Sequence, residues 1–337
     1  MRFTIENYNN FDKNSWNNVL ESMEGNLHLC TWQSLEYYSA FKNIRNVSFI
    51  VKEENQIKAM VPLAVNKNKQ NLLSFNEGFI FLPVFKYDIK KSLRKKIYDF
   101  IFEHIKLNFN KYKIVKFLSL PVNFHRNKVN ISSKNQFELL SKKPKINIQN
   151  TLIQNLKKST SELENQMSKY HLKNINKTSK MNIEFKIFNK DTSTDILSKE
   201  FENFKKLHFL SAGRSTRPIK TWKLMETQVK DNLGDLFSLR YEGKAISYLF
   251  CGRYKDFSWG WSQVNLRKYE KKVMPRHVLE WKAMLYYKNM KQSYYEIGIR
   301  YHEHEKFKPT KKELSISEFK EKYGSDSYPR SELSIRI

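Results

Sequence analysis

The segment that decides the fold is residues 236–262, LFSLRYEGKAISYLFCGRYKDFSWGWS. Apolar and aromatic residues dominate three runs within it, Leu236–Arg240, Ala245–Cys251 and Phe257–Ser262. Glu242–Gly243 separates the first two runs, and a glycine in so short a connection is typical of a tight hairpin turn. The segment therefore predicts three consecutive antiparallel strands.

A helix and one more strand follow this meander. Pro275 stands where we expect the first turn of the helix, because the fixed φ and missing N–H of proline suit that position. The apolar face of the helix is marked by Val278, Trp281, Met284 and Leu285. Tyr294–Ile299 then predicts a short strand. A parallel pair of strands needs a crossover, so we expect the helix to return this strand to the same sheet.

The first half of the chain shows the same order of elements. Val47–Lys52 and Ile57–Val65 flank a polar turn and predict a hairpin, and Phe75–Leu82 predicts another strand. Lys91–Ile105 has apolar residues at helical spacing, and Ile114–Leu118 predicts the strand after it. The helices expected near the start of the two halves cover residues 15–20, 32–41 and 201–210.

We therefore predict an α+β fold of two tandem units, each with a mixed, mostly antiparallel sheet flanked by helices. The polar stretch Pro144–Asn150 is the expected join, which gives units of residues 1–148 and 149–337. A length of 337 residues fits two domains of roughly 100–200 residues each. With 40% hydrophobic residues, the chain can bury two cores.

The sequence also indicates the cellular setting. The start, Met1–Tyr8, lacks the apolar core of a secretory signal, and no window approaches the ~18 apolar residues of a membrane span. Cys30 and Cys251 form neither a CxxC pair nor a disulfide framework. We expect a cytoplasmic protein without a transmembrane segment, for which peripheral membrane contact stays open.

The formal charge of +27 has two explanations that the sequence leaves open. One is an anionic partner, namely nucleic acid, a nucleotide cofactor or a membrane surface. The other is composition bias, because 48 lysines stand against 13 arginines. Residues 142–190 concentrate a net +8, and four of their lysines share one helix face, which is either solvated or directed at phosphates: Lys169, Lys173, Lys177 and Lys180.

Several side chains are candidates for chemistry. Glu296 lies in an apolar run, where a carboxylate is expected to have a raised pKa and to act as a general base, unless it pairs with Arg300 or a nearby lysine. His208 is a second candidate base, with helix packing as the alternative. Arg214 and Arg217 flank a short loop that suits an anion clamp, with loop salt bridges as the alternative.

Other site types find less support. Trp222 is a candidate for stacking on a substrate ring, with a core position as the alternative. His302 and His304 lack a clear third ligand, so we expect no metal. Neither a GxSxG elbow nor a Walker loop is present, which leaves serine hydrolases and P-loop NTPases unsupported.

Three stretches resemble the FemAB-like group of GNAT-fold acyltransferases, which carry two GNAT units in tandem. The first runs from Leu152 to Lys180 and includes two possible capping boxes, Ser159 with Glu162 or Ser161 with Glu164. The second begins at Phe204-Lys205-Lys206-Leu207-His208 and extends through Arg214, Arg217 and Trp222. The third, Lys312–Gly324, resembles the closing KE-x2-I-x2-FK-x2-FG pattern of the family.

The resemblance implies acyl transfer to an amino group of a cell-envelope sugar or peptide precursor, with acyl-CoA or aminoacyl-tRNA as donor. It also implies that Lys320, the lysine of the FK pair, stabilises an oxyanion or a phosphate, beside Phe319 in the pocket wall. An ordinary surface lysine is the alternative. The competing hypothesis is a non-catalytic, basic nucleic-acid-binding protein, for which the sequence offers no RNP1, zinc-finger or KH signature.

One departure from the family concerns the donor. Acetyl-CoA-binding GNAT proteins have a glycine-rich loop whose backbone N–H groups hold the pyrophosphate. The equivalent stretch, residues 267–276, has no glycine. Any phosphate contact there is therefore expected from side chains, namely Arg267, Lys271, Lys272 and Arg276.

Overall fold

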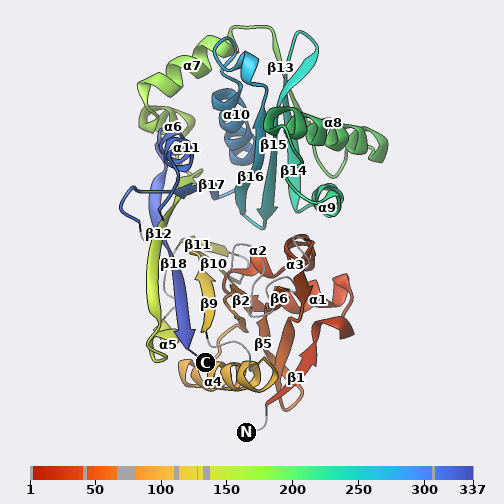
Figure 1. The fold of residues 1–337 in the computed structure, drawn as a ribbon, viewed down its shortest axis with the longest axis vertical. Helices are drawn as coiled ribbons and strands as arrows, with labels where there is room; N and C mark the ends of the chain where they lie inside the picture. Colours follow the sequence, from red (N-terminus) through yellow and green to blue (C-terminus); the bar gives the residue numbers. More distant parts are fainter. Residues whose placement is uncertain are drawn as a thin grey trace. The chain divides into compact units, whose positions relative to one another are not determined.

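A computed structural model describes residues 3–40, 44–66, 80–109, 114–126, 128–131, 137–305 and 308–336. The chain forms two compact units, Met1–Ile148 with Pro329–Ile337, and Gln149–Tyr328 (Figure 1). We placed residues 329–337 with the second unit from the sequence. They join the first because strand β18 (Asp326–Arg336) pairs antiparallel with β9 (Ile114–Ser119).

Unit 1 is built on a five-stranded sheet of order β1-β4-β5-β8-β2. Helix α4 packs Ile97, Ile101 and Ile105 into its buried core. The strands are β1 (Phe3–Asn7), β2 (Met23–Glu24), β3 (Ile44–Asn46), β4 (Phe49–Glu53), β5 (Gln56–Val61), β6 (Ala64–Asn66), β7 (Ile80–Phe81), β8 (Val84–Lys86), β9, β10 (Val122–His125) and β11 (Lys128–Ile131). The helices are η1 (Tyr8–Asn10), α1 (Lys13–Glu21), α2 (Leu27–Cys30), α3 (Trp32–Ser39), α4 (Lys91–Asn108) and α5 (Phe137–Leu140).

Unit 2 contains a mixed sheet in which β13, β14, β15, β16, β17 and β12 lie side by side. All its pairings in this order are antiparallel except that of β16 with β17. The strands are β12 (Lys145–Asn155), β13 (Ile183–Phe188), β14 (Gly234–Tyr241), β15 (Lys244–Tyr254), β16 (Phe257–Asn265) and β17 (Tyr294–Arg300). The helices are α6 (Thr160–Gln166), α7 (Lys169–Ser179), α8 (Thr194–Ala212), α9 (Ile219–Lys230), η3 (Arg267–Tyr269), α10 (Pro275–Asn289) and α11 (Lys311–Glu321).

The α+β class and the tandem arrangement are confirmed. Glu242 and Gly243 both have positive φ, 52° and 72°, as the hairpin turn between β14 and β15 requires. Ser159, rather than Ser161, forms the capping box with Glu162 at the start of α6. Of the expected strand Phe75–Leu82, residues 75–79 lie outside the described part, and Ile80–Phe81 forms β7.

Among the elements that the sequence analysis did not predict are β1, β12, β13, α9 and β18. The stretch Pro144–Asn150, the expected join, contains the division between the two units after Ile148, but it forms the start of strand β12, which begins at Lys145. Its residues Lys145–Ile148 do alternate polar and apolar side chains, as strands do, but the structure leaves both isoleucines exposed.

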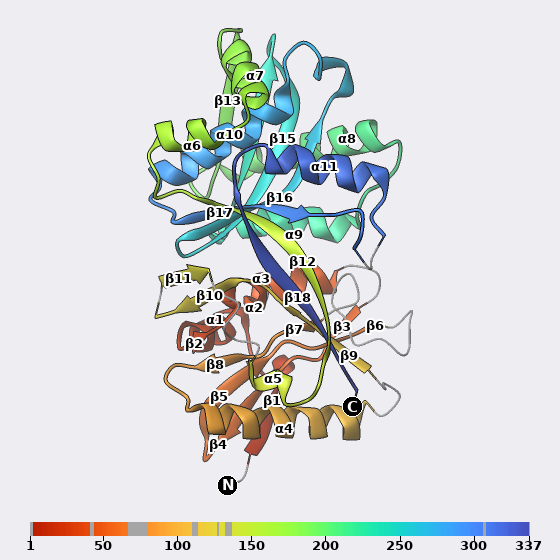
Figure 2. The same cartoon turned by 90° about the vertical axis from the view of Figure 1, so that its left-hand side faces the viewer.

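Strands β16 and β17 part after a short contact (Figure 2). Only Phe257–Trp259 and Tyr294–Glu296 pair with each other. Beyond that point β16 continues along β15 as far as Asn265, and β17 continues along β12 as far as Arg300. The two strands therefore diverge, and side chains from neighbouring helices can enter between them.

Helices α8 and α10 cover opposite faces of this sheet. Phe237 of β14 meets Tyr286 and Tyr287 of α10 at ring-centroid distances of 5.3 and 5.7 Å. The adjacent residue Leu236 pairs with Phe250, which meets Phe201 of α8 at 6.1 Å. Since neighbouring residues of a strand point to opposite faces, the two helices lie on different sides.

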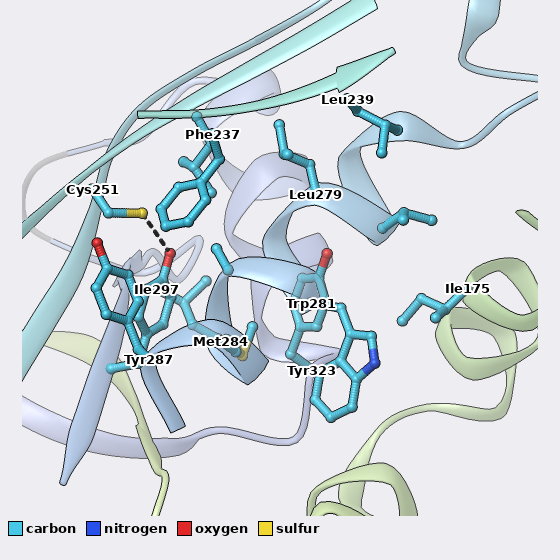
Figure 3. Close-up of a cluster of buried hydrophobic side chains, with 14 of the residues drawn as sticks. Ile175, Phe237, Leu239, Cys251, Leu279, Trp281, Met284, Tyr287, Ile297 and Tyr323 are labelled. Atoms are coloured by element: carbon cyan, nitrogen blue, oxygen red, sulfur yellow. Dashed lines mark hydrogen bonds between the residues drawn. The ribbon is translucent and has the colours of Figure 1, made fainter. Parts of the chain in front are cut away.

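The α10 face holds the core of unit 2. Figure 3 shows Trp281, Met284 and Tyr287 of α10 with Phe237, Leu239 and other buried apolar residues. The thiol of Cys251 lies 3.4 Å from the hydroxyl of Tyr295. Burial raises the pKa of this thiol well above its usual value, so Cys251 is a core residue rather than a nucleophile.

A histidine pair packs α7 against α10 and α11. The rings of His171 and His277 lie 4.4 Å apart, and both are buried. Phe319 lies 4.7 Å from His171 and 4.8 Å from His277. Burial lowers the pKa of each ring to about 4. The charge of His277 also lowers the pKa of His171, and the charge of Arg276 also lowers that of His277. Both rings are therefore neutral at pH 7.

This pair predicts acid sensitivity of unit 2. A histidine with a pKa of about 6.5 when unfolded and about 4 when folded takes up its proton first in the unfolded chain. Its stabilising effect is complete above pH 6.5 and is lost as the pH falls towards 4, at about 1.4 kcal/mol per pH unit. Urea titrations followed by tryptophan fluorescence give the free energy of unfolding at each pH. In His171→Phe, this free energy should depend less steeply on pH, by the contribution of about one proton. Exposed His302→Gln is the control, and an unchanged slope in His171→Phe contradicts the assignment.

Candidate functional site

The space between β16 and β17 receives Lys320 from α11. Helix α11 begins at a capping box formed by Thr310 and Glu313, and it packs against β17. The Nζ of Lys320 lies directly over Gly298, so close that a Cβ at position 298 would clash with it. Gly298 also has φ of +130°, which other residues rarely adopt. Glycine at 298 therefore makes the room in which the lysine amine sits.

Two carboxylates act on this amine, that of Glu280 on α10 and that of Glu296 on β17. Desolvation lowers the pKa of Lys320, while the charges of Glu280 and Glu296 raise it. The structure thus brings together Lys320 and Glu296, two residues that the sequence analysis singled out. The hydroxyl of Thr151 on β12 donates a hydrogen bond to Glu296. Arg300, named as a partner for Glu296, makes an ion pair with Glu321 at 2.8 Å.

Glu280 was missed by the sequence analysis. Its side chain is 6% exposed, and the hydroxyl of Tyr295 donates a 2.7 Å hydrogen bond to its Oε1. Burial raises the pKa of Glu280, and Tyr295, Lys320 and Arg276 oppose that shift. One signal was available, since Glu280 interrupts the apolar helix face at residues 278, 281 and 284. A carboxylate at such a position needs a buried partner.

A cavity of about 290 Å³ opens at the start of α10, and its lining residue Arg276 acts electrostatically on both Lys320 and Glu280. Met274 caps the helix with φ of 49°, and Pro275 lacks an N–H, so the backbone offers little to an anion. Arg276 supplies the charge and lies over the ring of Phe319 at 5.1 Å. The lining residues are Tyr170, Glu270, Lys271, Met274, Pro275, Arg276, His277 and Phe319.

The four cations expected at the donor phosphates thus separate into two pairs. Lys271 and Arg276 line the cavity. Lys272 lies instead over the ring of Tyr241, at 4.8 Å, and 3.8 Å from a carboxylate oxygen of Glu242. Arg267 is exposed on η3 and is not among the lining residues.

His208, Arg217 and Trp222 form a separate cluster on the α8 face of the sheet. Arg217 donates to the hydroxyl of Ser262 at 2.7 Å, and the Nε2 of His208 lies 3.2 Å from the same hydroxyl. The guanidinium of Arg217 stands 4.7 Å from the ring centre of Trp222. Burial and Arg217 lower the pKa of His208 to about 4. The structure does not bring His208 together with Lys320, and Arg214 is exposed on the loop.

The described part of the chain lacks two further types of feature. It holds no group of three His, Cys, Asp or Glu side chains arranged for a metal ion. None of its helices combines the length and the apolarity that crossing a bilayer requires.

Comparison with known proteins gives a clear result only at the level of structure. No protein-family model and no curated protein sequence matches the chain. The solved structure of FemX superimposes with a TM-score of 0.67 at 12% identity, covering 98% of this chain and 97% of its own. The structure of L-PGS from Bacillus licheniformis gives a TM-score of 0.60 at 14% identity, covering 97% of this chain and 92% of its own.

A tandem GNAT protein from the clavulanic acid biosynthesis pathway gives a TM-score of 0.52 at 8% identity, covering 99% of this chain and 98% of its own. At such identities the likeness concerns the fold. The chain has the tandem GNAT fold of the FemAB-like acyltransferases.

Proposed function

We propose that this protein is an N-acyltransferase whose active centre lies between β16 and β17 of unit 2. The observation that carries the proposal is the amine of Lys320, which lies over Gly298, is desolvated there and is within electrostatic reach of the carboxylates of Glu280 and Glu296. Burying a cation with two carboxylates costs desolvation free energy, which is difficult to explain by stability alone. Perturbed groups of this kind gather at functional sites.

The reaction is the aminolysis of an ester or thioester. The acceptor amine attacks the acyl carbon, a C–N bond forms, and the carbonyl oxygen gains the negative charge of the tetrahedral intermediate. That intermediate collapses with cleavage of the C–O or C–S bond of the donor, and the leaving oxygen or sulfur takes the bonding electrons. Lys320 stabilises the oxyanion, and Glu296 accepts the proton that the amine loses. Glu280, held by Tyr295, keeps Lys320 positively charged.

The donor is held by its phosphates in the cavity at the start of α10. Lys271 and Arg276 supply the positive charge, and the ring of Phe319 under Arg276 forms part of the wall. Coenzyme A and the acceptor end of tRNA both carry phosphates, so either acyl-CoA or aminoacyl-tRNA suits the cavity. The exposed lysines of α7, beside Tyr170, extend the positive surface towards a longer polyanion and favour tRNA.

For the acceptor, we propose an amino sugar or a peptide precursor of the cell envelope, acylated in the cytoplasm. The structural neighbours FemX and L-PGS support this class through their fold. The decisive experiment incubates the protein with labelled acetyl-CoA, other acyl-CoAs or a charged tRNA pool, and with amino-sugar and peptide acceptors. Transfer of label identifies the donor. Binding of tRNA without transfer from any donor would favour a non-catalytic nucleic-acid-binding protein instead.

The first variant tests the oxyanion role. Lys320→Met should lower kcat by about 10²–10³-fold, because one preorganised stabiliser of the oxyanion is lost while the packing volume is kept. Lys322→Met, two residues further along and exposed, is the matched control and should leave kcat unchanged. Full activity in Lys320→Met removes this residue from the mechanism.

The second variant tests whether Glu280 sets the charge of Lys320. Glu280→Gln can keep the hydrogen bond to Tyr295 but removes the negative charge that raises the pKa of Lys320. That pKa should fall, so the alkaline limb of the kcat–pH profile should move to lower pH by about one unit. Exposed Glu318→Gln on α11 serves as the control. A limb that stays in place, with a changed melting temperature only, reduces Glu280 to a structural role.

The third set tests the donor cavity. Arg276→Gln and Lys271→Gln should each raise the KM for the donor about tenfold with a smaller effect on kcat, since they remove phosphate contacts made before and during reaction. Arg267→Gln and Lys272→Gln remove the same charge outside the cavity and should change KM little. Equal effects from all four variants would point to general charge attraction rather than a phosphate site.

A further inference from the structure

The turn from α8 into α9 exposes an unusual amount of apolar surface. We refer to residues 203–225 as the elbow. Phe209 is 56% exposed, Leu210 is 70% exposed and Ile219 is 79% exposed. Single exposed apolar residues are ordinary, but three large ones within eleven positions form a patch that calls for a partner.

The elbow is also strongly basic. Residues 203–225 hold six Lys or Arg and no Asp or Glu. Two of these cations pair with acids just outside the elbow, Lys205 with Glu202 and Lys223 with Glu226. The side chains of Lys206, Arg214 and Lys220 are exposed beside the apolar patch.

A cavity of about 430 Å³ opens at the same place. Most of its wall surface is apolar, although Ser215 and Thr216 also line it, and this suits a hydrocarbon chain better than a sugar. Arg217 donates a hydrogen bond to Ser262 on the sheet and lies over the ring of Trp222. These contacts hold the loop against the sheet and so fix the position of the patch. The lining residues are Lys205, Lys206, His208, Phe209, Leu210, Ser215, Thr216, Ile219 and Trp222.

We propose that the elbow docks on the surface of a bilayer that contains anionic phospholipids. Phe209, Leu210 and Ile219 enter the boundary between head groups and acyl chains, and the cavity accepts part of one acyl chain. Lys206, Arg214 and Lys220 contact the lipid phosphates. Apolar side chains ringed by cations are the combination that such a surface attracts. The docking needs neither acyl donor nor acceptor, so it stands apart from the proposed reaction.

The test is sedimentation of the full chain with vesicles of phosphatidylcholine alone or with 30% phosphatidylglycerol, a composition of about one anionic lipid in three. Binding should require the anionic lipid and should weaken with added salt. The double variant Leu210→Ser/Ile219→Ser should reduce binding by about tenfold or more. Lys206→Gln/Lys220→Gln should reduce it by roughly fivefold per cation removed.

Matched controls come from the opposite end of α8. Ile196 is 52% exposed and Lys199 is exposed, so Ile196→Ser and Lys199→Gln make the same chemical changes outside the elbow. These controls should bind vesicles as the parent does, and all variants should keep the parent melting temperature. Three results would overturn the proposal: equal binding to neutral vesicles, equal losses in elbow and control variants, or elbow variants that lose tRNA binding while vesicle binding is unchanged.

Discussion

The parting of β16 and β17 after three residue pairs is the constraint on which the candidate site depends. A sheet that stayed paired would fill this space with cross-strand hydrogen bonds. Here Lys320 enters from α11 over Gly298, and Glu280 enters from α10 beside Gly260, where a Cβ would lie 3.2 Å from the carboxylate. Both glycines sit on the strands that part, so the divergence and the charged centre are one structural feature.

Local elements of the fold followed from sequence, whereas elements fixed by distant partners did not. The β14–β15 hairpin depends on a turn at Glu242–Gly243, and α10 depends on Pro275 and its own apolar face. Strand β18 depends on β9, more than 200 residues earlier, and its polar residues give no local signal. Strand β12 was missed for another reason, since its first residues alternate polar and apolar but stand in a stretch rich in Lys, Asn and Pro that was interpreted as a join.

For a related reason, the sequence predicted Lys320 and Glu296 of the candidate site but not Glu280. Lys320 and Glu296 stood out, one through a motif and the other through its apolar surroundings, and the fold brings them together. His208 seemed equally suitable, but a helix pattern does not reveal which face of the sheet the helix covers. Since α8 lies on the face opposite α10, His208 lies in the cluster with Arg217 and Trp222 and not beside Lys320. Glu280 was hidden because a carboxylate on a helix is normally taken for a solvent-exposed one.

The net charge of +27 does not by itself indicate a partner. The side chains next to each cation indicate which partner it suits. At the start of α10, Arg276 lies against Phe319 and a buried histidine, in a cavity that suits a phosphate on a defined ligand. At the elbow, Lys206 and Lys220 border bulky apolar side chains, which suits a lipid surface. Towards the end of α7, Lys177 and Lys180 have the exposed polar neighbours Asn176 and Ser179, which offer neither apolar surface nor a fixed pocket. Equal charges therefore favour different partners, and the adjoining uncharged surface separates them.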